Sequence, residues 1–475
     1  MREMEMEEFV DKALDYASKK SKYAEVRFFS STRNSVMMKN GAISASGYTV
    51  DSGMAIRMLN KSIAFSSINI GSWDRIKEEI DRAARMSEHP GRDNFSNETP
   101  VKDEWRVSQK QKIEDLPFEE RVNRLKELDG ILADEKIAMR ILALGDNIEE
   151  EFNTSSEGMA IRSRLPKVSL FAMMGYMENG TFEQGTVEVG YSGGYEAFDS
   201  WKLVDKLKHE SDVLKMAAKA KKLEDGTYDL IAGPEISGIV AHESAGHPTE
   251  SDRILGREMA QAGESFIKKD DRGKRVGSNI VNLVDDPTIE HSFGFYKYDR
   301  DGVKARKRYL YKLGIINEFL SNRESAGRLG EKSNAASRSS EWDKEPLVRM
   351  STTFIEPRDH SLEELLEGVK EGIYMKSFTE WNIDDIRFNE KYVGREAYHV
   401  KNGEIKEVVR RPVIETTTVN FYSSIDAIGK DIEFSAGTCG KGDPMQGVDV
   451  WMGGPSHTGK ESEGEVKSDG YRRDF

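Results

Sequence analysis

Apolar residues recur at helical spacing over residues 6–20, which predicts a helix with one buried face near the N-terminus. The pattern then changes to short runs bounded by turn residues, which predict strands at 24–29, 35–39 and 54–58. Asparagine, aspartate and glycine between these runs predict turns at Lys39-Asn40-Gly41 and Asp51-Ser52-Gly53.

Two further helices and a polar connection are predicted next. Amphipathic spacing indicates helices at 73–86 and 117–134. Residues 88–116 between them are polar and lack periodicity, so we expect a linker or a long loop without secondary structure. Strand character then returns over residues 137–190, and a charged amphipathic helix is predicted at 201–223.

The second half of the chain is predicted to be rich in strands and to contain one apolar helix. A short strand at 228–232 ends at Gly233-Pro234, and the apolar helix follows over residues 236–246. Additional strands are predicted near 280–284, 308–320 and 416–422, with one late helix at 361–374.

These elements predict an α+β fold with two domains. The N-terminal domain, residues 1–224, is expected to be a mixed α/β unit with an antiparallel sheet, with its linker at about 88–116. The C-terminal domain, residues 225–460, is expected to be β-rich and to carry the apolar helix. Residues 461–475, rich in glycine, serine, glutamate and lysine, are expected to form a mobile tail.

Composition narrows the class of protein and its partners. Of the 475 residues, 37% are hydrophobic and 32% charged, and no apolar run approaches the roughly 20 residues of a membrane helix. The net charge of −14 argues against nucleic acid as a partner, and the acidic N-terminus has no signal-peptide core. The chain has one cysteine, Cys439, so no intrachain disulfide can form and a cytoplasmic location is expected.

The most informative chemistry lies in the apolar helix, in the segment His242-Glu243-Ser244-Ala245-Gly246-His247. Two imidazoles and an adjacent carboxylate supply two ligands for a cation such as zinc and a general base for water. On a regular α-helix, however, the second imidazole would be rotated by about 140° from the first. We therefore expect a π-bulge, or an end of the helix at Gly246, that brings His247 back toward His242.

A catalytic zinc usually has three protein ligands, so a third ligand is expected elsewhere in the chain. Cys439 lies in the glycine-rich segment 436–442, and the nearby Lys441 would favour its thiolate form. A free cysteine is equally often a small apolar residue at the end of a strand, so both interpretations stay open on chemistry alone. A third interpretation pairs Cys439 with a histidine as a catalytic dyad, but no residue near Cys439 in the sequence would orient such a base.

Several segments, in this order along the chain, resemble the TldD/PmbA family of proteases and its TldD-like branch in particular. The segments at 23–27 and 51–57 resemble the opening strands of the family, and Ile239–His247 resembles its metal-binding helix. Later segments that resemble the family are 322–326, 346–350 and 437–441.

The resemblance implies a zinc-type metallopeptidase that hydrolyses short or unfolded peptides in a cavity inside a dimer. It implies that His242, His247 and Cys439 bind one divalent metal ion, expected to be zinc, and that Glu243 is the general base. The expected partners are a peptide or unfolded protein and a second subunit, either identical or PmbA-like, with neither nucleic acid nor membrane.

Two other functions fit the same residues. The chain could be a non-catalytic metal-binding or assembly protein, which a closed site with four protein ligands would favour. It could also be a metal-dependent amidase that acts on non-peptide substrates, which an assay on small amides would reveal.

Overall fold

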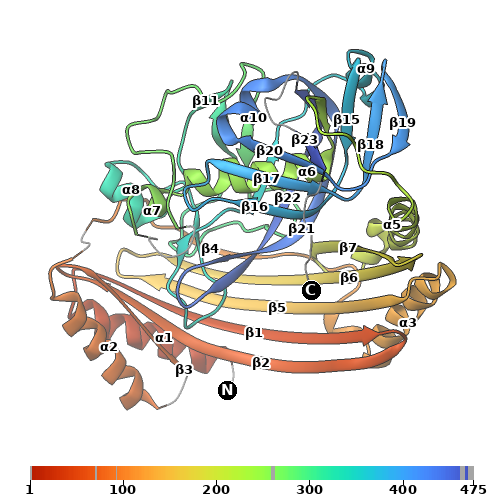
Figure 1. Ribbon diagram of the computed structural model, residues 1–475. Helices are drawn as coiled ribbons and strands as arrows, with labels where there is room; N and C mark the ends of the chain where they lie inside the picture. The colour runs from red at the N-terminus through yellow and green to blue at the C-terminus, as the bar shows by residue number, and fades with distance from the viewer. Residues whose placement is uncertain (1–2, 70–71, 92–93, 258–262, 460–465, 469–475) are drawn as a thin grey trace.

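A sheet of long strands lies beside a β-rich half that encloses a short helix (Figure 1). The computed structural model describes residues 3–69, 72–91, 94–257, 263–459 and 466–468. The prediction of an α+β fold with antiparallel sheets is confirmed.

The N-terminal half is built on a seven-stranded sheet with the order β3-β2-β1-β5-β6-β4, in which β7 also pairs with β6. All these pairs are antiparallel except β4 with β6. The strands are β1 (Tyr23–Lys39), β2 (Ala42–Leu59), β3 (Ile63–Asn69), β4 (Lys102–Arg106), β5 (Met139–Ser155), β6 (Ala160–Glu178) and β7 (Thr181–Ser192).

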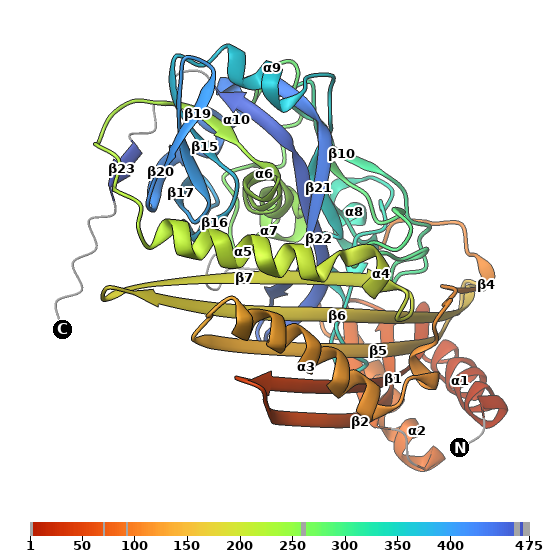
Figure 2. The same cartoon turned by 90° about the vertical axis from the view of Figure 1, so that its right-hand side faces the viewer.

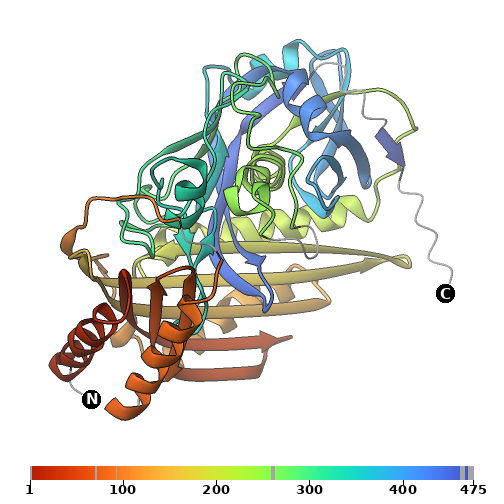
Figure 3. The same ribbon diagram turned by 90° about the vertical axis from the view of Figure 1, so that its left-hand side faces the viewer.

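Two groups of helices cover the two ends of this sheet. Helices α1 (Glu3–Ser18) and α2 (Trp73–Ser87) pack against β1, β2 and β3, and Figure 3 shows them in red and orange at the lower left. Helices α3 (Phe118–Asp134) and α5 (Leu203–Ala217) share a core with β5, β6 and β7 (Figure 2). The helix predicted at 201–223 is observed as the shorter α5, and the left-handed Lys202 separates it from α4 (Ala197–Trp201).

The C-terminal half is organised around a ten-stranded sheet with the order β11-β10-β9-β14-β22-β8-β15-β18-β19, in which β21 pairs with β22. Its strands are β8 (Asp229–Ala232), β9 (Leu283–Asp285), β10 (Arg308–Lys312), β11 (Ile315–Ile316), β14 (Thr352–Ile355), β15 (Glu371–Met375), β18 (Ala397–Lys401), β19 (Glu404–Val408), β21 (Ile425–Lys441) and β22 (Gln446–Gly459). Helix α6 (Pro234–Val240) packs against β22 in the core of this half, and Figure 2 shows it end-on among the strands.

Two smaller sheets and four short helices complete the described part of the C-terminal half. One sheet pairs β12 (Ser337–Arg338) with β13 (Leu347–Val348), and the other has the order β16 (Phe378–Ile383), β17 (Asn389–Gly394), β20 (Pro412–Thr417) and β23 (Val466–Ser468). The helices are α7 (Ser251–Ile254), α8 (Arg323–Leu329), α9 (Leu362–Glu367) and α10 (Thr418–Ser424).

The first strands are longer than predicted. Residues 24–29 and 35–39 belong to the single strand β1, which β2 and β5 flank along its length. The turn expected at Lys39-Asn40-Gly41 is present, with Asn40 and Gly41 at positive φ. The turn expected at Asp51-Ser52-Gly53 is wrong, because these residues lie inside β2. A side chain at Gly53 would come within 2.1 Å of the Trp342 ring, so this glycine admits a close contact with the C-terminal half.

Three later predictions also differ from the structure. The helix expected at 361–374 begins as predicted with Ser361 as its cap, but α9 ends at Glu367 and the following residues form β15 between β8 and β18. The strand expected at 416–422 ends at Thr417, whose side chain caps α10. The stretch 88–116 is not free of secondary structure, since it contains β4 and a short 3-10 turn at Ile113–Asp115.

Most of the tail predicted at 461–475 lies outside the described residues, and the part that is described, 466–468, forms β23. Among the described helices, none combines the length and the apolar character that crossing a membrane requires.

Candidate metal centre

The segment from His242 to His247 forms a π-helical turn directly after α6. Residues Ala241–Gly246 adopt the π conformation, and the backbone N–H of His247 donates to the carbonyl of His242, five residues earlier. Of the alternatives that the sequence left open, the π-bulge is the one observed, and the two rings lie at a centroid distance of 4.9 Å. A side chain at Gly246 would come within 1.8 Å of Met350 Sδ, so the chain needs a glycine where it leaves this turn.

The structure brings Cys439 to the two histidines. Cys439 lies on β21 opposite Val448 of β22, and its Sγ is 3.4 Å from His247 Nε2. The ligand-type atoms of His242, His247 and Cys439 all lie within 4.8 Å of one another, and all three residues are buried. These three residues could therefore hold a metal ion.

Burial and neighbouring charges set the protonation of these three groups. Burial lowers the pKa of both His242 and His247, which favours the neutral imidazoles that bind metals. Burial alone would raise the pKa of Cys439, but the nearby His247 and Arg349 outweigh it and bring this pKa to about 7. A substantial fraction of the thiol is therefore ionised near neutral pH.

A buried carboxylate that the sequence analysis missed orients His247. Glu250 Oε2 lies 3.0 Å from His247 Nδ1, which fits a ring that donates from Nδ1 and presents the Nε2 lone pair toward Cys439. Burial would raise the pKa of Glu250, but Lys441 and Arg253 outweigh it and hold this pKa well below its usual range. The only signal in the sequence is the spacing, since Glu250 lies three residues after His247.

The carboxylate of Glu243 lies beside the three residues. Its Oε2 is 4.0 Å from His247 Nε2, and the side chain is largely buried. Arg387 donates from Nη1 to the same oxygen, from the loop that joins β16 to β17. No local sequence pattern marks Arg387, which 144 residues separate from Glu243.

A second buried hydrogen-bond network holds the π-helical turn at Ser244. The Ser244 hydroxyl donates to Glu390 Oε2, which also accepts from the Tyr392 hydroxyl at 2.7 Å. The Tyr311 hydroxyl donates to the Ser244 carbonyl at 3.1 Å. Burial raises the pKa of Glu390 to about 7, so this carboxyl group is partly protonated near neutral pH.

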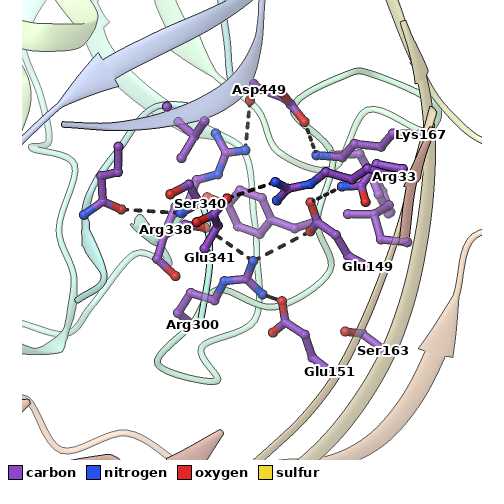
Figure 4. Close-up of a pocket in the computed structure, with 18 of the residues that line it drawn as sticks. Arg33, Glu149, Glu151, Ser163, Lys167, Arg300, Arg338, Ser340, Glu341 and Asp449 are labelled. Carbon is purple, nitrogen blue, oxygen red and sulfur yellow. Dashed lines mark hydrogen bonds and ion pairs between the residues drawn. The ribbon is translucent and has the colours of Figure 1, made fainter. Parts of the chain in front are cut away.

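A cavity lined by residues of both halves lies apart from this cluster. It has a volume of about 650 Å³, and Figure 4 shows that ion pairs line it. Lys167 lies 2.7 Å from Asp449 and Arg33 lies 2.9 Å from Glu341, so both pairs join the N-terminal sheet to the C-terminal half. None of His242, Glu243, His247 and Cys439 lines this cavity, although it reaches Val448, the residue paired with Cys439.

Comparison with known families covers nearly the whole chain. Models described as PmbA/TldA metallopeptidase domain 1, central domain and C-terminal domain match residues 24–87, 111–224 and 225–457.

Individual proteins that are similar to this chain are named as metalloproteases or share its fold. A metalloprotease of Methanocaldococcus jannaschii is 31% identical over 444 residues, which are 91% of this chain and 94% of the relative. A zinc metalloprotease TldD homolog of Saccharolobus solfataricus is 33% identical over 231 residues, about half of each chain. The crystal structure of TldE from Thermococcus kodakarensis shares the fold, with a TM-score of 0.74 at 16% identity over 95% of this chain and 99% of that one.

Proposed function

Because the chain belongs to the PmbA/TldD metallopeptidase family, we propose that it is a zinc-type metallopeptidase that hydrolyses short or unfolded peptides. The observation that carries the proposal is the meeting of His242, His247 and Cys439 within 4.8 Å, with Glu243 beside them. The similarity to a zinc metalloprotease TldD homolog supports the choice of metal.

The chemistry of these donor atoms fits zinc. In proteins Zn²⁺ takes imidazole nitrogen and thiolate sulfur, and its catalytic sites commonly use three protein ligands with a fourth position open. In this chain His242, His247 and Cys439 would be those ligands, and Glu250 would keep His247 Nε2 directed at the ion. A metal bound there supplies a Lewis acid that polarises the scissile carbonyl and acidifies water.

Glu243 would carry the proton through the reaction. It accepts a proton from the attacking water as the new C–O bond forms. It then gives this proton to the leaving nitrogen as the C–N bond breaks, so the carboxylate is regenerated. Since Glu243 touches the reacting atoms in this scheme, it is the catalytic residue, and burial keeps its carboxylate away from bulk water.

The proposed working unit is a dimer with a second copy of the chain or with a PmbA-like subunit. The outer edge of β2 over residues 42–52 pairs with no described strand, and it exposes Ile43, Tyr48 and Val50. Such an edge can accept a strand from another chain. Light scattering should give about twice the 53.7 kDa of one chain, or a PmbA-like subunit should co-purify. A 53.7 kDa species without a bound subunit would contradict this part of the proposal.

Removal of the metal tests the proposal as a whole. We expect EDTA to abolish cleavage of unfolded peptides and added zinc to restore it, since neither carbonyl polarisation nor water activation would remain. Unfolded peptides of unrelated sequence should be cleaved, and folded proteins should resist. Cleavage that persists in protein shown by elemental analysis to be metal-free would contradict the proposal, and cleavage of small amides alone would indicate an amidase.

One observation favours a second mechanism without a metal. Cys439 Sγ lies 3.4 Å from His247 Nε2, and Glu250 orients the imidazole, which is the arrangement of a cysteine–histidine catalytic pair. Such an enzyme would keep its activity in EDTA and lose it to thiol alkylation. We prefer the metal mechanism because the pair alone gives no role to His242 and Glu243.

Replacing Glu250 by glutamine is expected to weaken zinc binding by about 10–100-fold, because His247 loses the carboxylate that orients its ring. Calorimetric titration of metal-free protein measures this affinity. Asp252→Asn is the matched control, since Asp252 also binds Lys441 but has no hydrogen bond to His247 among the described residues. Equal zinc affinities of the two variants would show that Glu250 does not orient the ligand.

A further inference from the structure

Arg387 reaches Glu243 from a strained position in a well-held loop. Its backbone is left-handed, with a φ of 63°, which is uncommon for a residue with a side chain. Its backbone N–H donates to the Asp384 carbonyl at 3.0 Å, and its carbonyl accepts from the Thr418 hydroxyl at 2.9 Å. A strained backbone conformation that its surroundings enforce is typical of functional sites.

The guanidinium of Arg387 has spare hydrogen-bonding capacity. Nη1 donates to Glu243, whereas the buried Nε finds no hydrogen-bond partner among the described residues. A buried donor without a partner costs free energy, so this N–H is available to an acceptor that enters the candidate active site. The side chain retains 13% of its exposure, which leaves it within reach of a ligand.

We propose that Arg387 is a second catalytic residue, whose guanidinium binds the oxyanion that forms on the scissile carbonyl. This inference rests on the proposed function. As water attacks, the π electrons of the C=O bond move onto its oxygen, and the water proton passes to Glu243. Glu243 thereby loses its negative charge at the moment when the substrate oxygen becomes negative. The guanidinium of Arg387 can then bind the oxyanion in place of the Glu243 carboxylate. Arg387 itself transfers no proton.

An alternative role for Arg387 is to hold Glu243 in place. The two roles differ in what a substitution removes. If Arg387 only positions Glu243, it changes the rate through Glu243 alone. If it is an oxyanion donor, it binds the transition state directly. A peptide phosphonamidate carries anionic oxygens in the tetrahedral arrangement of the intermediate, so its affinity reports the direct contact.

Arg387→Ala is therefore expected to lower kcat by about 10²–10³-fold with little change in KM. The affinity for the phosphonamidate should fall by a similar factor, while the zinc affinity from calorimetry stays unchanged. Added guanidinium ion should restore part of the activity of Arg387→Ala. Arg387→Lys keeps the positive charge and is less disruptive to folding, and its kcat should lie between those of the wild type and Arg387→Ala. Lys391→Ala on β17 of the same hairpin is the control and should behave as wild type.

Three outcomes would overturn the inference: unchanged kcat in Arg387→Ala, unchanged phosphonamidate affinity, or a loss of zinc binding that accounts for the defect. Failure of the proposed function is distinguishable, because zinc-loaded wild-type protein would then cleave no peptide at all.

Discussion

Replacing Glu243 by glutamine is expected to lower kcat/KM for peptide hydrolysis by about 10²–10⁴-fold, the usual contribution of a general base. The amide has nearly the shape of the carboxylate and can still accept a hydrogen bond from Arg387, but it cannot take a proton from water. Zinc binding should persist, because Glu243 is not one of the three residues that converge as ligands. Steady-state kinetics and elemental analysis on the same sample measure both quantities.

Glu235→Gln provides the matched control for this variant. Glu235 lies in the first turn of α6, on the same helical segment, and pairs with Arg395 rather than with the histidines. We expect this variant to retain zinc and activity. A Glu243→Gln protein that cleaves at the wild-type rate would rule out Glu243 as the base, and one that loses zinc would instead assign Glu243 to the metal.

The sequence predicted the elements whose pattern is local. Helices α2 and α3 carry their own amphipathic spacing, and their observed bounds agree closely with the predicted ones. The segment after Ser361 shows where this fails. Its capping residues specify the start of a helix, but past Gly368 the residues Ile373 and Met375 are buried in the sheet beside β8, and pairing with a distant strand decides their conformation.

In the candidate site, too, features with a local sequence pattern were predictable and contacts between distant residues were not. The spacing of His242 and His247 was enough to predict a departure from a regular helix, since a regular helix would separate the rings, and the structure shows which departure occurs. The pairing of His247 with Cys439 spans 192 residues. Chemistry alone left the role of that cysteine open, and the resemblance to a family implied that it is a ligand. Arg387 and Glu390 could not be found, because they contact Glu243 and Ser244 across 144 and 146 residues of sequence.

Replacing Cys439 by serine is expected to remove most of the zinc affinity. A serine hydroxyl stays protonated near neutral pH and is a much poorer zinc ligand than a thiolate, whereas neighbouring charges bring the pKa of Cys439 to about 7. We expect the zinc affinity to fall by at least about 100-fold, since loss of a residue that only hydrogen-bonds to a metal ligand already costs up to about that much. Calorimetric titration of metal-free protein measures it directly.

The stability of the protein gives an independent measurement of the same loss. At a zinc concentration about 100 times the wild-type Kd, zinc should add about 2.7 kcal/mol to the free energy of unfolding of the wild-type protein. A 100-fold weaker site gains only about 0.4 kcal/mol under the same condition. Thr438→Ser, at the exposed neighbouring position on β21, should behave as wild type. If Cys439→Ser gained the full wild-type stabilisation from zinc, Cys439 would not be a ligand, and the metal would have to be held by the two histidines and a group other than the thiol.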